Sequence, residues 1–67
     1  MQLSARNRLT GKVKEVLVGT VVAEVVVDIG GKEIAAVITR KSAEELGLKP
    51  GETVVAVVKA TDVMLER

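Results

Sequence analysis

Residues 20–39 read TVVAEVVVDIGGKEIAAVIT, and this stretch decides the fold class. Valine recurs through it, and β-branched residues favour strands. Within Thr20–Ile29 one set of alternate positions is entirely apolar and the other set is half apolar. Gly30-Gly31 can supply the positive φ values that a two-residue hairpin turn needs. The stretch therefore predicts two antiparallel strands, Thr20–Ile29 and Lys32–Thr39, joined by a tight hairpin.

A further strand is expected on each side of this hairpin. Leu9–Val18 is rich in alternating apolar and charged residues until Gly19 interrupts the pattern. Glu52–Ala60 alternates in a similar way after a turn signal at Pro50-Gly51. A short last strand is expected at Val63-Met64-Leu65 after a break in the pattern.

One short helix is expected between the third and fourth strands. Ser42 followed by Glu45 fits a capping box, with Ser42 as the N-cap, and Gly47 closes the helix. Five strands with a helix at this place predict a mainly β fold, a small Greek-key barrel of the OB type, formed by a single domain over residues 1–67.

Self-association is expected from the size of the chain and from its outer faces. The chain has 67 residues, and domains of this size are usually supported by disulfides, a structural metal or oligomerisation. It contains no cysteine and no histidine. Disulfides are therefore excluded, and so are structural metal sites built from the usual cysteine and histidine ligands. The outer strand faces also carry valine, at positions 22, 26, 55 and 57, which favours a buried subunit interface.

Composition excludes several classes of function. Without cysteine or histidine, thiol and imidazole catalysis are absent, and we expect no catalytic residues and no enzyme activity. Without Phe, Trp or Tyr, the chain lacks the aromatic side chains on which nucleic-acid bases stack. With a net charge of +1, it also lacks the strong positive potential that attracts the phosphate backbone. No segment has the apolar length of a membrane span or the pattern of a signal peptide, so we expect no membrane partner and a cytoplasmic location.

The remaining polar residues form a donor-rich set. They are Ser4, Arg6, Asn7, Thr39, Lys41, Ser42, Lys59, Thr61 and Asp62. Each has an ordinary interpretation on its own: a helix cap for Ser42, a strand end for Thr39, a solvated charge for Lys59, and a surface arm for Ser4 and Arg6. Together, hydroxyls, a guanidinium and an ammonium suit an oxyanion that only accepts hydrogen bonds.

The motifs resemble those of the molbindins, proteins with a single Mop domain that bind molybdate. The resemblance covers essentially the whole chain. It rests on the segment Ser4-Ala5-Arg6-Asn7, on Thr39 and Ser42 at the helix start, on Glu45-Leu46-Gly47, and on Lys59-Ala60-Thr61-Asp62-Val63.

The resemblance implies a homohexamer, a trimer of dimers, that holds molybdate or tungstate as an oxyanion at subunit interfaces, with no metal ligated directly and no organic cofactor. It implies that Ser4, Ala5 and Arg6 come from one subunit, and that Thr39, Ser42, Lys59 and Ala60 come from its neighbour. A second oxyanion site is expected around Gly19, Thr20 and Val21.

The function implied by the resemblance is the cytoplasmic storage and homeostasis of molybdate and tungstate. One alternative is a ligand-sensing module that acts through a regulatory partner. A second alternative is an OB-fold nucleic-acid binder, which the missing aromatic residues disfavour. The sequence also leaves a molybdopterin-like ligand open.

Overall fold

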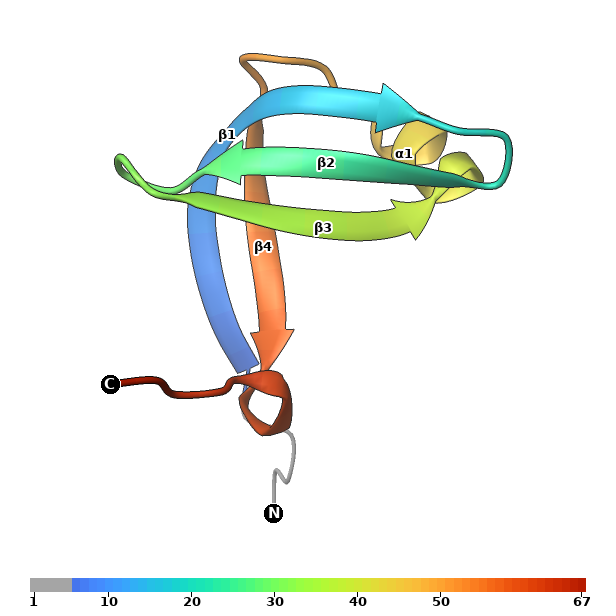
Figure 1. The fold of residues 1–67 in the computed structure, drawn as a ribbon. Coiled ribbons are helices and arrows are strands. Elements are labelled where there is room, and N and C mark those ends of the chain that lie inside the picture. The colour runs from blue at the N-terminus through green and yellow to red at the C-terminus, as the bar shows by residue number, and fades with distance from the viewer. Residues whose placement is uncertain (1–5) are drawn as a thin grey trace.

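The computed structural model describes residues 6–67 as one curled, antiparallel sheet with a short helix (Figure 1). The order of strands across the sheet is β3-β2-β1-β4. In chain order the elements are β1 (Arg6–Val18), β2 (Val22–Asp28), β3 (Glu33–Thr39), α1 (Arg40–Leu46), β4 (Thr53–Lys59) and the 3-10 turn η1 (Ala60–Asp62). The mainly β prediction and the helix between the third and fourth strands are therefore confirmed.

Strand β1 is the long element that both halves of the sheet share. Its first half, up to Lys12, pairs with β4, and its second half, from Lys12 onward, pairs with β2. The register with β2 shifts between Val13 and Glu15, which is a β-bulge at Lys14, and bulges increase the local bend of a strand. Figure 1 shows β1 turning sharply, so that β4 crosses behind β2 and β3.

Gly11 allows β1 to approach the end of β2. A Cβ at this position would lie 2.3 Å from the carbonyl oxygen of Asp28 and 2.9 Å from a methyl carbon of Val27. No side chain fits at that distance, so the missing Cβ of Gly11 is required for the bend of the sheet.

The core lies on the concave face of the curled sheet. Val13, Val25 and Val27 are almost fully buried, and Ile34, Ile38 and other aliphatic residues pack around them. The predicted alternation along β2 is confirmed, since Ala23, Val25 and Val27 are buried and Val22, Glu24 and Asp28 are exposed.

Both predicted turns are confirmed in detail. Gly30 and Gly31 have φ values of 84° and 93°, as a primed hairpin turn requires. The Gly31 N–H also donates to the carboxylate of Asp28 at 2.8 Å. At the second turn the Glu52 N–H donates to the Lys49 carbonyl at 3.1 Å, and Gly51 has a φ of 93°, which is the pattern of a type II turn with Pro50 at its second position.

The helix cap differs from the prediction. Thr39, and not Ser42, is the N-cap of α1, and its side-chain oxygen accepts from the Ser42 N–H at 3.0 Å. The helix therefore begins three residues earlier than the capping-box pattern indicated. Thr39 has the extended backbone of an N-cap because it also ends β3, so one residue serves both elements. Gly47 closes the helix in the left-handed conformation, as predicted.

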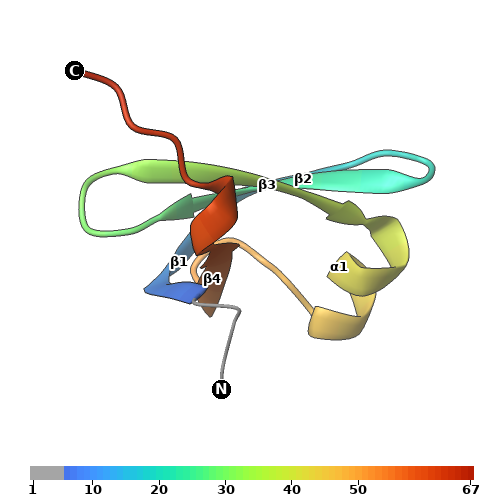
Figure 2. The ribbon, with the colours of Figure 1, turned by 90° about the horizontal axis from the view of Figure 1, so that it is seen from below.

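The prediction of a fifth strand at Val63-Met64-Leu65 is wrong for the described chain. After β4 the turn η1 redirects the backbone, and residues 63–67 run away from the sheet without a strand partner among the described residues (Figure 2). The four strands consequently form a half-barrel in which β3 and β4 do not pair. The observed strands also differ at their ends from those predicted, most clearly in β1, which begins at Arg6 instead of Leu9.

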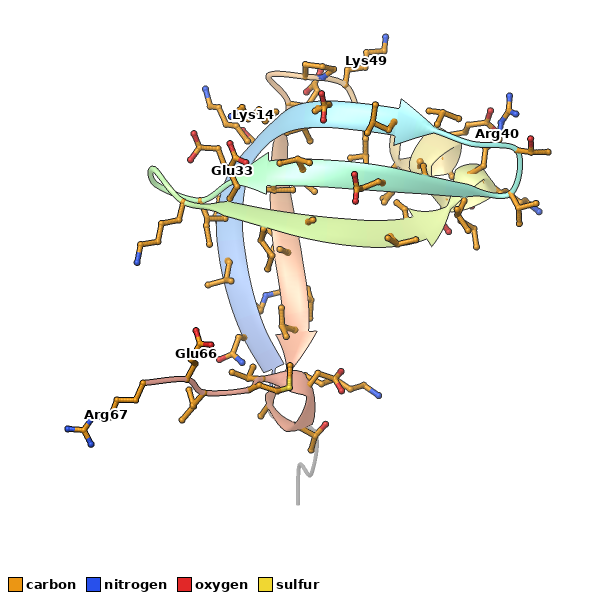
Figure 3. All side chains as sticks on the ribbon, in the orientation of Figure 1. Lys14, Glu33, Arg40, Lys49, Glu66 and Arg67 are labelled. Carbon is orange, nitrogen blue, oxygen red and sulfur yellow. The ribbon has the colours of Figure 1, made fainter. Side chains whose placement is uncertain are left out.

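An ion pair spans the outer surface of the sheet. The Lys14 ammonium at the β1 bulge donates to the Glu33 carboxylate at the start of β3, and Figure 3 shows both side chains beside the end of β2. The hydrogen bond to Glu33 and the charge of that carboxylate hold the pKa of Lys14 above its ordinary value. The pair thus links the two strands that flank β2.

Candidate functional site

Two groups of candidate anion ligands come from different parts of the fold. The first group lies where β1 begins and β4 ends. Arg6 and Lys59 are register partners across these two strands, and Lys59 is exposed. Ala60 follows immediately as the first residue of η1. Ser4 and Ala5, which the resemblance adds to this group, lie outside the described residues.

Asn7 reinforces the pairing at this end of the sheet. Its side-chain amide donates to the carbonyl of Val58 at 3.4 Å, one register pair away from Arg6 and Lys59. Asn7 belongs to the donor-rich set without an assigned role, and its contact across the strand pair identifies it as a support of the β1–β4 register.

The second group consists of the two hydroxyls at the start of α1. Thr39 Oγ1 and Ser42 Oγ are 2.8 Å apart, with Thr39 as donor, while Thr39 Oγ1 accepts from the Ser42 N–H at 3.0 Å. The hydroxyl proton of Thr39 is therefore used in the hydrogen bond to Ser42 Oγ. The Ser42 hydroxyl proton can then be donated to an acceptor-only ion.

These two groups do not meet in a single chain. Figures 1 and 2 show α1 at one side of the half-barrel, whereas β4 runs away from α1 and ends at η1. Lys59 therefore lies beside Arg6 and away from Thr39 and Ser42. The resemblance implied that Lys59 and the hydroxyls come from the same subunit, and that division stays a prediction.

The predicted second site, Gly19, Thr20 and Val21, is the connection between β1 and β2. The Gly19 N–H donates to the Val22 carbonyl at 2.8 Å, which closes this connection. The Val21 carbonyl accepts from the Arg40 N–H at 2.8 Å, so the connection lies against the first residue of α1. No pattern in the sequence indicates this contact, because it joins segments that are distant along the chain.

The chemistry of both groups is hydrogen-bond donation. Within residues 6–67 no cluster of three or more acidic, histidine or cysteine side chains is arranged to hold a bare metal ion. The same residues include no helix of the length and apolarity that crossing a membrane requires. The candidate ligands with described side chains, Thr39, Ser42 and Lys59, bring two hydroxyls and one ammonium, which are suited to an oxyanion.

Comparison with known proteins agrees with this chemistry. Residues 3–65 match the model of the TOBE domain. The chain belongs to the TOBE domain family. Within this family it is 53% identical, over 66 residues and 97% of both chains, to a protein named molybdenum-pterin-binding protein 2 from Clostridium pasteurianum. The resemblance to the single Mop-domain proteins is thereby confirmed.

Two solved structures share the fold of this chain. MopII from Clostridium pasteurianum is 51% identical and superposes with a TM-score of 0.89, covering 98% of this chain and all of the other. A molybdate binding protein from Sporomusa ovata is 45% identical, with a TM-score of 0.90 over the full length of both chains. The curled four-stranded sheet with one short helix is therefore the architecture of these two proteins as well.

Proposed function

We propose that this chain is a non-catalytic, cytoplasmic binder of molybdate and tungstate that stores these oxyanions and maintains their supply. In this proposal residues 1–67 act as one domain and assemble into a homohexamer, a trimer of dimers. The observation that carries the proposal is the separation of two donor groups in a chain whose relatives are named for molybdenum. The two positive charges belong to one group, and the two hydroxyls at the helix start belong to the other.

The proposed site lies between copies of the chain. Arg6, Lys59 and the Ala60 backbone of one copy, with Ser4 and Ala5 of the same arm, face Thr39 and Ser42 of another copy. A guanidinium and an ammonium supply the two positive charges that balance the dianion, and the hydroxyls supply neutral donors. The connection Gly19-Thr20-Val21 is proposed as a second, separate oxyanion site.

The proposed ligand is the bare oxyanion. The names of the relatives include a pterin, but this chain has no Phe, Trp or Tyr on which a pterin ring would stack. We therefore assign no organic cofactor to the site.

Calorimetric titration with molybdate tests the assignment. Lys59→Ala removes a charge-assisted hydrogen bond, and we expect a loss of about 2 to 4 kcal/mol, which is about 30-fold to 1,000-fold in affinity. Lys32→Ala is the matched control, because Lys32 is an exposed lysine in the β2–β3 hairpin. Unchanged affinity in Lys59→Ala, or an equal loss in Lys32→Ala, contradicts the proposed site.

Mixed assemblies test whether two copies share each site. Lys59→Ala and Ser42→Ala are each expected to bind weakly when pure. After the two variants are unfolded and refolded together, some interfaces combine an intact Lys59 with an intact Ser42, so a fraction of tight sites should return. If no tight sites return in the mixture, the ligands do not come from two copies.

A further inference from the structure

The outer face of the strand pair β1–β4 carries several cations. Residues 8–13 of β1 alternate between exposed and more buried positions, and Arg8 and Lys12 are both exposed. β4 alternates in the same way, with Val57 and Lys59 among its exposed residues. Arg8 and Val57 are register partners, and neighbouring side chains of a strand point to opposite faces. These four exposed residues therefore share one face of the sheet.

Arg8 lies diagonally across this face from Lys59. Val57 is the register partner of Arg8, and Lys59 follows two residues further along β4. Diagonal neighbours on one face of an antiparallel pair are about 7 to 8 Å apart. Arg6, which the proposed site also uses, is the register partner of Lys59. Arg8 is consequently the next cation along β1 from the proposed anion position.

Within the described residues, no carboxylate pairs with the cations of this face. β4 contains no acidic residue, and the one acidic residue of β1, Glu15, lies in the half of the strand that pairs with β2. The two ion pairs of residues 6–67 involve neither Arg8 nor Lys59. The positive charge of Arg8 is therefore available to an anion bound beside Lys59.

We infer that Arg8 is a third cation of the proposed oxyanion site, and that its charge selects doubly charged oxyanions over singly charged oxyanions of the same shape. The inference rests on the proposed function and deepens it. Arg6 and Lys59 already supply the two charges that balance a dianion, so Arg8 adds a net attraction. This attraction is twice as large for molybdate as for perrhenate, a tetrahedral oxyanion with one negative charge, because Coulomb energy scales with the charge of the anion.

The exposure of Arg8 makes its contribution depend on salt. The screening length for exposed charges is about 30 Å at an ionic strength of 0.01 M and about 3 Å at 1 M. A charge about 7 to 8 Å from Lys59 therefore acts on the anion at low ionic strength and is screened at high ionic strength. A purely structural role of Arg8 in strand pairing would not produce this dependence.

Calorimetric titration of the full chain with molybdate at the two ionic strengths tests the inference. We expect Arg8→Gln to lower the affinity by about fivefold or more at 0.01 M, and by less than about twofold at 1 M. Arg8→Lys keeps the charge and should stay within about twofold of the wild type at both ionic strengths.

Lys12→Gln is the matched control. It removes one charge from the same face of the same strand, but Lys12 is six residues away from the register partner of Lys59, which is about 20 Å along the strand. We expect it to lower the affinity for molybdate by less than about twofold at either ionic strength.

Competition between molybdate and perrhenate measures the selection by charge. At 0.01 M the ratio of molybdate affinity to perrhenate affinity should be at least about twofold higher in the wild type than in Arg8→Gln. Lys12→Gln should keep the wild-type ratio. A ratio that is the same in Arg8→Gln and in the wild type contradicts the selection by charge.

Three further results at low ionic strength overturn the inference. They are an unchanged molybdate affinity in Arg8→Gln, a loss in Arg8→Lys as large as in Arg8→Gln, and an equal loss in Lys12→Gln. The wild-type titration tests the proposed function separately. If the wild type binds no molybdate at either ionic strength, the proposed function fails and the inference fails with it. If the wild type binds molybdate and Arg8→Gln binds it equally well, the inference alone fails.

Discussion

The side-chain oxygen of Thr39 accepts a hydrogen bond from the Ser42 N–H at 3.0 Å, and the two hydroxyl oxygens are 2.8 Å apart. The two hydroxyls at the helix start therefore have different tasks. Thr39 holds the first turn of α1, and in the proposed site Ser42 donates its hydroxyl proton to the oxyanion.

Substitution of each hydroxyl should separate these tasks. Thr39→Ala removes the N-cap and should lower the free energy of unfolding by about 1 kcal/mol. Ser42→Ala keeps its backbone N–H and the cap bond, so it should change stability less and molybdate affinity more. Denaturant unfolding and calorimetric titration of both variants measure the two effects, and an equal loss of stability in both would contradict the division.

Gly11 should tolerate no side chain. In Gly11→Ala the new Cβ meets the Asp28 carbonyl at 2.3 Å, and relief requires movement of one strand. We expect a loss of about 1 to 3 kcal/mol in the free energy of unfolding. Thr10→Ala, an exposed position in the same strand, is the control and should stay within about 0.5 kcal/mol of the wild type. Equal stability of the two variants would show that the approach of β1 to β2 is not tight.

The Lys14–Glu33 pair should make stability depend on alkaline pH. The pKa of Lys14 is raised in the folded chain, so the folded state holds this proton more tightly than the unfolded state. The stabilisation is complete at pH values below the ordinary lysine pKa of about 10.4 and is lost as the pH rises through the raised value. Thermal melts across this range should show the loss. In Glu33→Gln the dependence should weaken, and an identical pH profile in that variant would rule out the pair as its cause.

The proposed site should discriminate among anions by protonation and by size. Phosphate at neutral pH carries a proton that needs an acceptor, and the proposed ligands include no carboxylate. Sulfate is a dianion like molybdate but is smaller, so it cannot reach donors held by two subunits at hydrogen-bonding distance. We expect molybdate and tungstate to bind within about tenfold of each other, a difference under about 1.4 kcal/mol, and the other two anions at least about 100-fold more weakly. Competition among the four anions measures this order, and displacement of molybdate by equal sulfate would reject it.

Local signals predicted the parts of the fold that depend on neighbours in sequence. The alternation along β2, the Gly30-Gly31 hairpin and the Pro50-Gly51 turn depend on the preferences of a few adjacent residues, and all three are present in the structure. The cap of α1 was misplaced because Thr39 and Ser42 are both residue types favoured at an N-cap, and only Ser42 is followed three residues later by a glutamate. The choice between them depends on where β3 stops.

The remaining features of the fold and of the site depend on how distant segments are arranged, and local sequence patterns do not predict that arrangement. Val63-Met64-Leu65 has the composition of a strand, but the backbone turn at η1 leaves it without a partner among the described residues. The resemblance named Arg6 and Lys59 as ligands without indicating that they are register partners in one chain. Residue types predicted the chemistry of the candidate site, whereas the proposed division of its ligands between copies depends on the path of β4.

The double pairing of β1 has a consequence for the order of folding. β1, β2 and β3 are consecutive along the chain and can pair as successive hairpins, whereas β4 must return to the beginning of β1. Closing so long a loop is slow compared with forming a local hairpin. We therefore expect Arg6 and Lys59 to come together only in the last step, so that the proposed anion binding would mark the chain that has finished folding.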